Sequence, residues 1–349
     1  MYNSNLSSLF FRKFLFGGLK LVRIKTLVMV LILAFMLGTS VTALAQSDLV
    51  ITGVIDGDLP NGLPKAVELY VLNDITDLSI YGLESANNGA TASGEEFTFP
   101  SDSVAAGDFI YVATETPQFS AFFGFAPNYT NGAAISINGN DVIVLYKNGV
   151  IVDVFGEIGV DGTGQPWEYM DGWAYRVNGT GPDGTTFVLN NWFFSGPNAL
   201  DGETTNNTSK TPFPIGTFSG PPNCSNAVAS VDTIWPPNHK FIYIEVLGVT
   251  DPDGDNVAIT MDSILQDEPV DSVGDGSFSP DGTGVCSSFA YVRAERAQSG
   301  NGRVYHIGFT AEDGNGGSCS GEVLVGVPKS QGRNGTPIDE GALFDSTIP

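Results

Sequence analysis

The sequence predicts an all-β protein with two β-sandwich domains in tandem. Short runs rich in β-branched and aromatic residues recur along the chain, separated at regular intervals by turns rich in Gly, Asn and Asp. The clearest pair of runs is Asp141–Phe155, DVIVLYKNGVIVDVF, in which Asn148 and Gly149 suit a two-residue turn because both tolerate positive φ. We expect this hairpin at the centre of the first sandwich.

The first 45 residues have the order of a secretory signal peptide. Basic residues precede an apolar run from Leu27 to Leu37, and the small residues of Ala43-Leu44-Ala45 follow it. The apolar run falls short of the roughly 20 residues that a membrane span needs. We therefore predict cleavage after Ala45 and a secreted protein (extracellular, periplasmic or on the cell surface) without a membrane span in the mature chain. An uncleaved N-terminal anchor is the alternative.

The mature chain is strongly acidic. Five of the 15 Lys and Arg lie in the leader and all 39 Asp and Glu follow it, so residues 46–349 carry a net charge of −29. Nucleic acid is not an expected partner, because phosphate binding requires clustered Lys and Arg. An acidic surface keeps a secreted protein soluble and attracts cations.

The first predicted domain spans residues 46–218. Strands are expected at 49–57, 65–73, 76–83, 97–100, 109–113 and 173–177, and one short helix at 117–123. The aromatic residues of 192–207 are expected to cover an open sheet edge. Residues 211–222 are rich in Pro and Gly, which predicts the connection to the second domain.

Several motifs of this region occur in the order found in one known family. They are Val67-Glu68-Leu69-Tyr70, Asp77-Leu78-Ser79, Phe97-Thr98-Phe99-Pro100, Ala106-Gly107-Asp108 and the hairpin end Val152-Asp153. Over about 130 residues the chain resembles a lamin tail domain of the bacterial, secreted kind, with a longer Gly/Asn loop at 86–94. The resemblance implies an immunoglobulin-like β-sandwich without catalytic residues. In bacteria such domains often accompany secreted nucleases and phosphatases as attachment or interaction modules.

The second predicted domain spans residues 219–349. Strands are expected at 241–246, 257–261, 289–296, 303–313 and 321–328, antiparallel and with one face in water. The segments WPPNHK (235–240), QDEPV (266–270), RAER (293–296) and GRVY (302–305) resemble an immunoglobulin-like repeat common in bacterial secreted proteins. That resemblance implies a second immunoglobulin-like sandwich and little about function.

Three cysteines follow the leader: Cys224, Cys286 and Cys319. An exported protein can join two of them and leave one over. We predict a Cys224–Cys319 bridge that ties the start of the second domain to its last long strand, with Cys286 as a buried thiol. Zinc is not expected, because the chain has only two histidines and lacks a Cys-x-x-Cys pair.

No set of residues predicts catalysis, so we expect neither a catalytic nor a cofactor-binding residue. The acid pairs Glu95-Glu96 and Asp267-Glu268 cannot converge, because neighbours on a strand point to opposite faces, and we expect them to be solvated loop acids. His239 lies in a Pro-Pro-Asn-His turn and His306 on a strand, both without a nucleophile elbow, so both are expected to be structural.

One acidic loop predicts a metal site. In TDPDGDN (250–256), Asp251, Asp253 and Asp255 alternate and can place hard oxygens around one Ca²⁺ ion. The alternative is an acidic β-turn, since Asp-Pro-Asp-Gly forms a turn by itself.

These observations predict a secreted, non-catalytic adhesion, attachment or interaction protein. We expect its partner to be a protein, a cell-envelope component or a polysaccharide, and the sequence does not name it. The alternatives are an accessory-domain protein of a secreted hydrolase system, acting with a nuclease or phosphatase, and a structural component of the cell surface or matrix.

Overall fold

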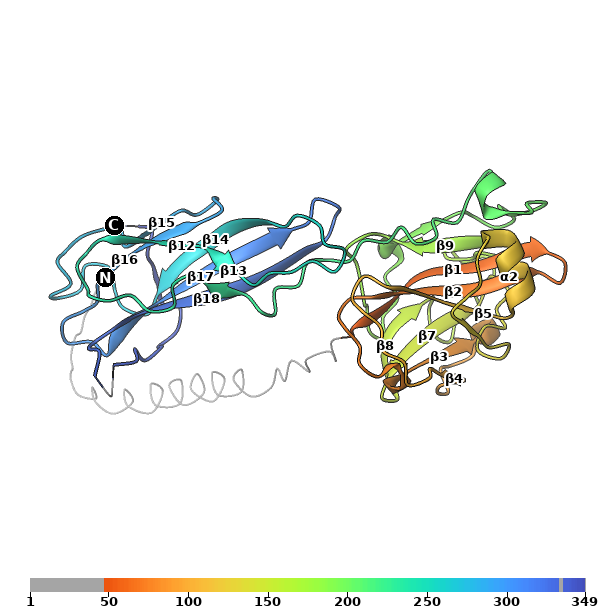
Figure 1. Ribbon diagram of the computed structural model, residues 1–349, viewed down its shortest axis with the longest axis horizontal. Coiled ribbons are helices and arrows are strands. Elements are labelled where there is room, and N and C mark those ends of the chain that lie inside the picture. The colour runs from red at the N-terminus through yellow and green to blue at the C-terminus, as the bar shows by residue number, and fades with distance from the viewer. Residues whose placement is uncertain (1–46, 333–334, 349) are drawn as a thin grey trace, which may run out of the picture. The chain divides into compact units, whose positions relative to one another are not determined.

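Most of the regular secondary structure of the described residues is β-strand (Figure 1). The computed structural model describes residues 47–332 and 335–348, so the predicted signal peptide at 1–45 lies outside the described residues. Five sheets form in this part of the chain, and all strand pairs are antiparallel except the short β5–β6 pair. The prediction of an all-β protein is confirmed.

Two sheets build the N-terminal part, residues 47–218. The six-stranded sheet has the order β10 (Trp192–Phe194), β9 (Gly172–Arg176), β1 (Leu49–Leu59), β2 (Leu63–Val71), β5 (Phe109–Ala113), β6 (Tyr129–Thr130). The four-stranded sheet has the order β4 (Phe97–Thr98), β3 (Tyr81–Ala86), β7 (Val142–Lys147), β8 (Val150–Phe155).

These two sheets share one hydrophobic core. Val67 and Leu69 of the six-stranded sheet and Leu83, Val144 and Val154 of the four-stranded sheet are all fully buried in it. Alternate residues of each strand point to the same face, so each sheet can present one apolar face to the other. Residues 47–218 are therefore organised as two packed β-layers.

A helix and a loop cover the other face of the six-stranded sheet. Helix α2 (Thr116–Phe123) begins where the Glu115 side chain accepts the Gln118 N–H, and it ends at Gly124 in the left-handed conformation. In Figure 1 this helix lies over the strands of the sheet. Its Phe119 and Phe122 are buried in one cluster with Val50 and Tyr70 of the sheet. The predicted helix at 117–123 is confirmed.

The segment that was predicted as a connection is partly packed. Phe213 and Phe218 are buried in the same cluster as α2, and the Gly216 N–H donates to the buried Glu68 carboxylate at 2.8 Å. The two aromatic side chains hold residues 213–218 on the sheet. A Pro-rich loop has no regular hydrophobic pattern, so the sequence did not indicate that they are buried. The connecting segment is therefore shorter than residues 211–222.

The Asn-Gly hairpin forms as predicted, but not at the centre of its sheet. Lys147 pairs with Val150, and the two turn residues have φ of 51° at Asn148 and 73° at Gly149. Strand β3 pairs with β7 on its other side, which leaves β8 at the end of the sheet order. Turn chemistry fixes a hairpin but not its neighbours.

Three sheets build the C-terminal part, from residue 219 onward. The largest has the order β18 (Ser318–Pro328), β17 (Gly302–Glu312), β14 (Ala258–Gln266), β19 (Phe344–Asp345). The others are β12 (Phe241–Ile244), β16 (Ala290–Arg293), β15 (Gly282–Thr283), and the pair β11 (Val228–Ala229), β13 (Val246–Leu247). Met261, Tyr305 and Phe309 of the largest sheet share a core with Ile244 and Val292 of the three-stranded sheet.

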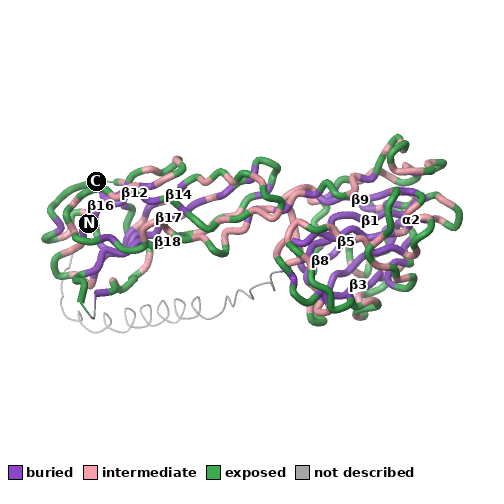
Figure 2. Tube along the Cα trace, viewed as in Figure 1, coloured by how far each residue is buried: buried purple, intermediate pink, exposed green. Residues whose placement is uncertain are grey.

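The remaining regular elements of the described chain are single 3₁₀ turns: η1 (Leu78–Ile80), η2 (Asn87–Gly89), η3 (Leu189–Asn191) and η4 (Asn206–Thr208). Buried residues follow the strands of both parts (Figure 2). None of the helices in the described residues has the length and apolarity to cross a membrane.

The predicted disulfide is confirmed, and the predicted state of the third cysteine is wrong. Cys224 and Cys319 are bonded, with Cα atoms 5.9 Å apart. Cys286 is a free, exposed thiol in the turn between β15 and β16, where its φ is 64°. A disulfide is typical of proteins outside the reducing cytosol.

Candidate functional site: the acidic loop and the junction

The structure brings the three predicted calcium ligands together. Asp251, Asp253 and Asp255 lie in the loop between β13 and β14, and each offers an oxygen within 4.8 Å of the others. The Asp251 Oδ1 accepts the backbone N–H groups of Asp253 at 2.9 Å and Asp255 at 3.1 Å. Gly254, with φ of 76°, allows the chain to turn so tightly.

The middle carboxylate also joins the two parts of the chain. The Tyr70 hydroxyl of β2 donates to Asp253 Oδ1 at 2.5 Å, and Ser219 Oγ and the Gly220 N–H donate to Oδ2 at 3.1 Å and 2.8 Å. Three donors thus satisfy Asp253 without a metal. Asp253 is a junction residue, a role that its position in an acidic turn does not indicate.

The electrostatics of the loop are unfavourable without a counter-charge. Burial raises the pKa of Asp251; two backbone N–H donors oppose this shift, and the carboxylates of Asp253 and Asp255 add to it. Burial and the hydrogen bond to Asp253 raise the pKa of Tyr70, so its hydroxyl stays a neutral donor. A cation would relieve the repulsion. Calcium binding stays a prediction.

We expect millimolar calcium to raise the melting temperature and chelator to reverse the rise. A dissociation constant of about 10⁻⁴–10⁻³ M is usual for extracellular modules, and ten times that concentration adds about 1.4 kcal/mol of stability. Asp251→Asn should blunt the rise, because it removes one charge and keeps the Oδ1 that accepts the turn N–H groups. Thermal melts with calcium and with chelator measure the effect.

The matched control for this experiment is Tyr70→Phe. It removes the hydrogen bond to Asp253 but leaves all three carboxylates, so it should lower the melting temperature and keep the calcium shift. Melting temperatures that do not respond to calcium in any of the three proteins would show that the loop is only a turn.

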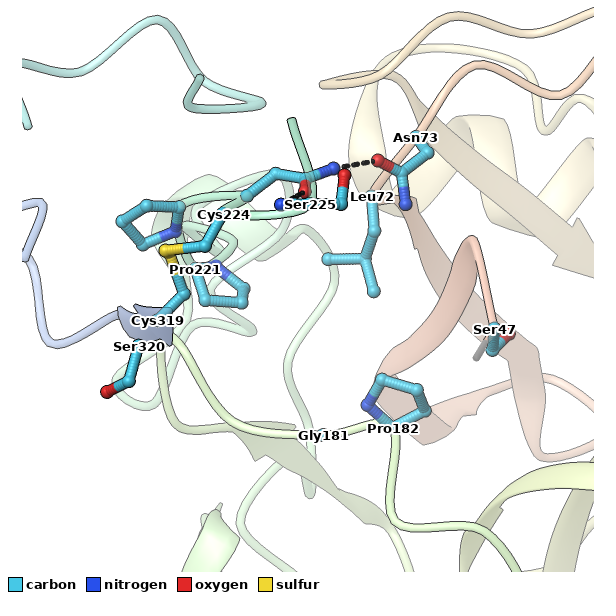
Figure 3. Close-up of a pocket in the computed structure, with 12 residues that line it drawn as sticks. Ser47, Leu72, Asn73, Gly181, Pro182, Pro221, Cys224, Ser225, Cys319 and Ser320 are labelled. Atoms are coloured by element: carbon cyan, nitrogen blue, oxygen red, sulfur yellow. Dashed lines mark hydrogen bonds between the residues drawn. A yellow bond between two sulfur atoms is a disulfide. The ribbon is translucent and has the colours of Figure 1, made fainter. Parts of the chain in front are cut away.

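A pocket of about 380 Å³ lies beside this junction (Figure 3). Its wall includes Leu72 and Pro182 of the N-terminal part and the Cys224–Cys319 disulfide, and the Asn223 side chain donates to Asn73 Oδ1 at 2.6 Å. Its 12 lining residues are Ser, Asn, Pro, Gly, Leu and bonded Cys. None of these side chains titrates near neutral pH, so the pocket lining offers no acid or base.

Both histidines bond to carboxylates. His239 Nδ1 lies 3.1 Å from Glu295 Oε2, a buried carboxyl. His306 Nδ1 and Nε2 each lie 3.0 Å from a carboxylate oxygen, of Glu322 and Asp339 respectively. An imidazole that donates from both nitrogens carries a positive charge. Burial alone would lower the pKa of His306, but the two carboxylates outweigh it and raise the pKa above 6.5.

We expect His306 to make stability fall as pH rises. Its contribution is complete below pH 6.5, the unfolded value, and is lost as pH rises through the raised folded pKa. His306→Asn should remove this part of the slope, measured as urea midpoints below and above neutral pH.

Two other groups make stability fall as pH rises: burial raises the pKa of Glu68 to about 7 and of Glu295 to about 9. The difference between wild type and variant isolates His306, and parallel curves would contradict its role.

A buried ionic cluster surrounds Arg303 of β17. Its guanidinium lies 2.6 Å from Asp281, 3.3 Å from Glu268, 3.7 Å from Glu295 and 3.8 Å from Asp275, and its side chain is fully buried. Burial and the neighbouring Asp281 raise the pKa of Glu295 to about 9, so this pair holds a proton at neutral pH. One feature of the sequence does point to this cluster. Arg303 alternates in phase with Tyr305 and Ile307, whose side chains point into the core.

This cluster corrects one sequence prediction. Asp267 and Glu268 are buried rather than solvated, because Asp267 accepts the Val304 and Glu340 N–H groups and Glu268 pairs with Arg303. The two side chains have different partners, as expected for neighbours on an extended chain.

No family model, curated protein or solved structure matches this chain. The resemblances to the lamin tail domain and to the immunoglobulin-like repeat therefore stay predictions from the sequence.

Proposed function

We propose that this chain is a secreted, non-catalytic attachment protein. In this proposal residues 46–218 are a lamin-tail-like domain and residues 219–349 an immunoglobulin-like domain, each a β-sandwich. The predicted leader, the disulfide and the packed sheets of both parts support it. Its location is extracellular, periplasmic or on the cell surface.

One observation carries the non-catalytic part of the proposal. The junction pocket is lined by residues that neither donate nor accept protons near neutral pH, although the chain has 39 acidic side chains. The buried acids instead hold loops and arginines, as Asp267 and Asp281 do. General acid–base chemistry needs a titratable group within reach of a bound substrate.

The test is retention of pure residues 46–349 on native cell-envelope and culture-medium fractions, measured by co-sedimentation. We expect saturable retention without turnover of DNA, phosphate esters or glycosides in parallel assays. Turnover that is lost in His239→Asn or Glu295→Gln would overturn the proposal in favour of a hydrolase. Absence of retention, with calcium-dependent self-association instead, would favour a structural matrix component.

A further inference from the structure

The three-stranded sheet of the C-terminal part exposes aromatic residues where a sheet normally faces water with polar ones. Ile244, Ala290 and Val292 point into the core, so the alternating positions Phe241 and Tyr243 point outward. Phe241 is 39% exposed and Tyr243 is 41% exposed. The sequence pattern predicts a wet face here, and the structure shows an apolar one.

Four rings form one continuous surface, which we call the aromatic face: Phe241, Tyr243, Phe289 and Tyr291. Ring centroids are 6.4 Å apart for Phe241–Tyr291, 5.6 Å for Tyr243–Tyr291 and 5.2 Å for Tyr243–Phe289. The Arg293 guanidinium lies 4.2 Å from the Phe241 centroid and borders the face. Contact between neighbouring rings makes this a patch rather than scattered exposed residues.

The opposite sheet of the same part shows that this surface is not general. On its outer side the Thr310 hydroxyl donates to Asp262 at 2.8 Å and lies 3.2 Å from the Ser320 hydroxyl. These positions are polar, as expected for an antiparallel sheet with one face in water, and Leu324 of β18, 45% exposed, adds an apolar side chain but no aromatic ring to this side. The two sheets that share this core thus differ in the side chains on their outer faces. A ligand bound to the aromatic face would shield its rings from water.

The size and charge of the aromatic face restrict that partner. An aromatic side chain has about 150–250 Å² to bury, so four partly exposed ones offer only a few hundred Å², well below the roughly 800 Å² per partner of a stable protein interface. The net charge of −29 on residues 46–349 also repels a second copy and polyanions such as nucleic acid. An uncharged ligand made of small repeating rings fits both the small contact area and the negative charge.

Sugar rings have the complementary chemistry. The faces of aromatic rings are negative and attract the polarised C–H groups on one side of a pyranose. Sugar hydroxyls can bond at the border of the face, where the Tyr243 hydroxyl donates to the exposed Glu245 at 2.6 Å. The rings are tilted by 40° to 68° for the three pairs named above, so they suit a twisted single chain better than a flat crystal surface.

We propose that the aromatic face binds single chains of a neutral polysaccharide. The inference rests on the proposed attachment function and assigns it a site and a ligand class. Phe241 and Tyr243 stack on the sugar rings, Phe289 and Tyr291 support them, and Glu245 accepts hydrogen bonds from sugar hydroxyls.

The test is affinity electrophoresis of residues 46–349 in gels that contain soluble xyloglucan, mixed-linkage β-glucan, galactomannan or starch. We expect at least one polymer to retard the protein. Phe241→Ala with Tyr243→Ala should weaken that binding about tenfold or more, because one stacked ring is worth about that factor. Tyr243→Phe should retain most of it. Both positions are exposed, and unchanged melting temperatures would show that the variants fold.

Phe193→Ala is the matched control, because Phe193 of β10 is 61% exposed but lies outside the aromatic face. It should bind like wild type. Lack of retardation by all four polymers, or equal retardation of the double variant, overturns the inference. If the double variant is still retained on envelope fractions, the attachment function stands and the aromatic face is the wrong site. Self-association that the double variant abolishes would instead assign the face to a second copy.

Discussion

Replacing Arg303 with methionine should destabilise the C-terminal part by about 3–5 kcal/mol, the usual cost of removing one partner from a buried ionic group. Asp275, Asp281 and Glu295 are fully buried around this guanidinium, and Arg293, at 3.7–3.8 Å from two of them, cannot replace its contacts. Methionine fills a similar volume, so the loss is mainly electrostatic. Urea unfolding at neutral pH, followed by circular dichroism, measures it.

Two comparisons make this result specific. Arg296→Met removes a partly exposed guanidinium that donates to the backbone carbonyls of Ala297 and Lys329, and should cost about 1 kcal/mol or less. The penalty of Arg303→Met should also shrink in acid, where protonation removes the uncompensated charge of the carboxyls. An Arg303→Met variant as stable as wild type at neutral pH would show that water reaches the cluster and screens it.

Arg176→Met should destabilise the N-terminal part by a similar amount, about 3–5 kcal/mol. Arg176 is fully buried; its Nη2 lies 2.9 Å and 2.8 Å from the two oxygens of the buried Asp153, and its Nη1 lies 2.7 Å from Asp183. Its guanidinium also lies 4.4 Å from the Trp192 ring centroid. The substitution leaves the buried Asp153 carboxyl, whose pKa burial already raises, without the cation that opposes this shift.

Lys210→Met is the control for Arg176→Met. The Lys210 side chain is 90% exposed and lies 3.9 Å from Glu203, so its loss should change the free energy of unfolding by less than about 1 kcal/mol. Equal effects of the two substitutions in urea unfolding would contradict the buried role of Arg176.

Together the two arginine variants test the predicted domain division at residue 218. If residues 46–218 and 219–349 fold independently, calorimetry should show two transitions, with Arg176→Met lowering one and Arg303→Met the other. The separate hydrophobic cores favour this outcome. A single transition lowered by both would mean that junction contacts such as Tyr70–Asp253 couple the two cores.

The sequence predicted the elements whose signals are local. The β-branched runs, the Asn148-Gly149 turn and the helix that follows Glu115 depend on neighbours in the chain, and each is present. The three aspartates of the acidic loop also meet as predicted, because a turn of five residues suffices to bring them together.

The features that could not be predicted depend on distant partners. Arg303 meets Glu268 and Asp281 from 35 and 22 residues away, so only the folded sheet shows that these acids are buried. The exposure of Cys286 depends on how the folded sheet places the turn between β15 and β16. The second role of Asp253 depends on Tyr70, which lies far away in the sequence. The alternating pattern of β12 showed that the strand has two different faces, but it did not show which face is exposed to water.

The Cys224–Cys319 bridge has a mechanical consequence for a chain that is anchored at both ends. Tension that enters at residue 224 passes through the covalent bond to β18, so the 94 residues between the two cysteines, which are 95 positions apart, carry no load. At about 3.3–3.6 Å per extended residue, the closed bridge reduces the contour length that the C-terminal part can release on unfolding by roughly 310–340 Å. Single-molecule pulling with and without reductant would show this difference in contour length.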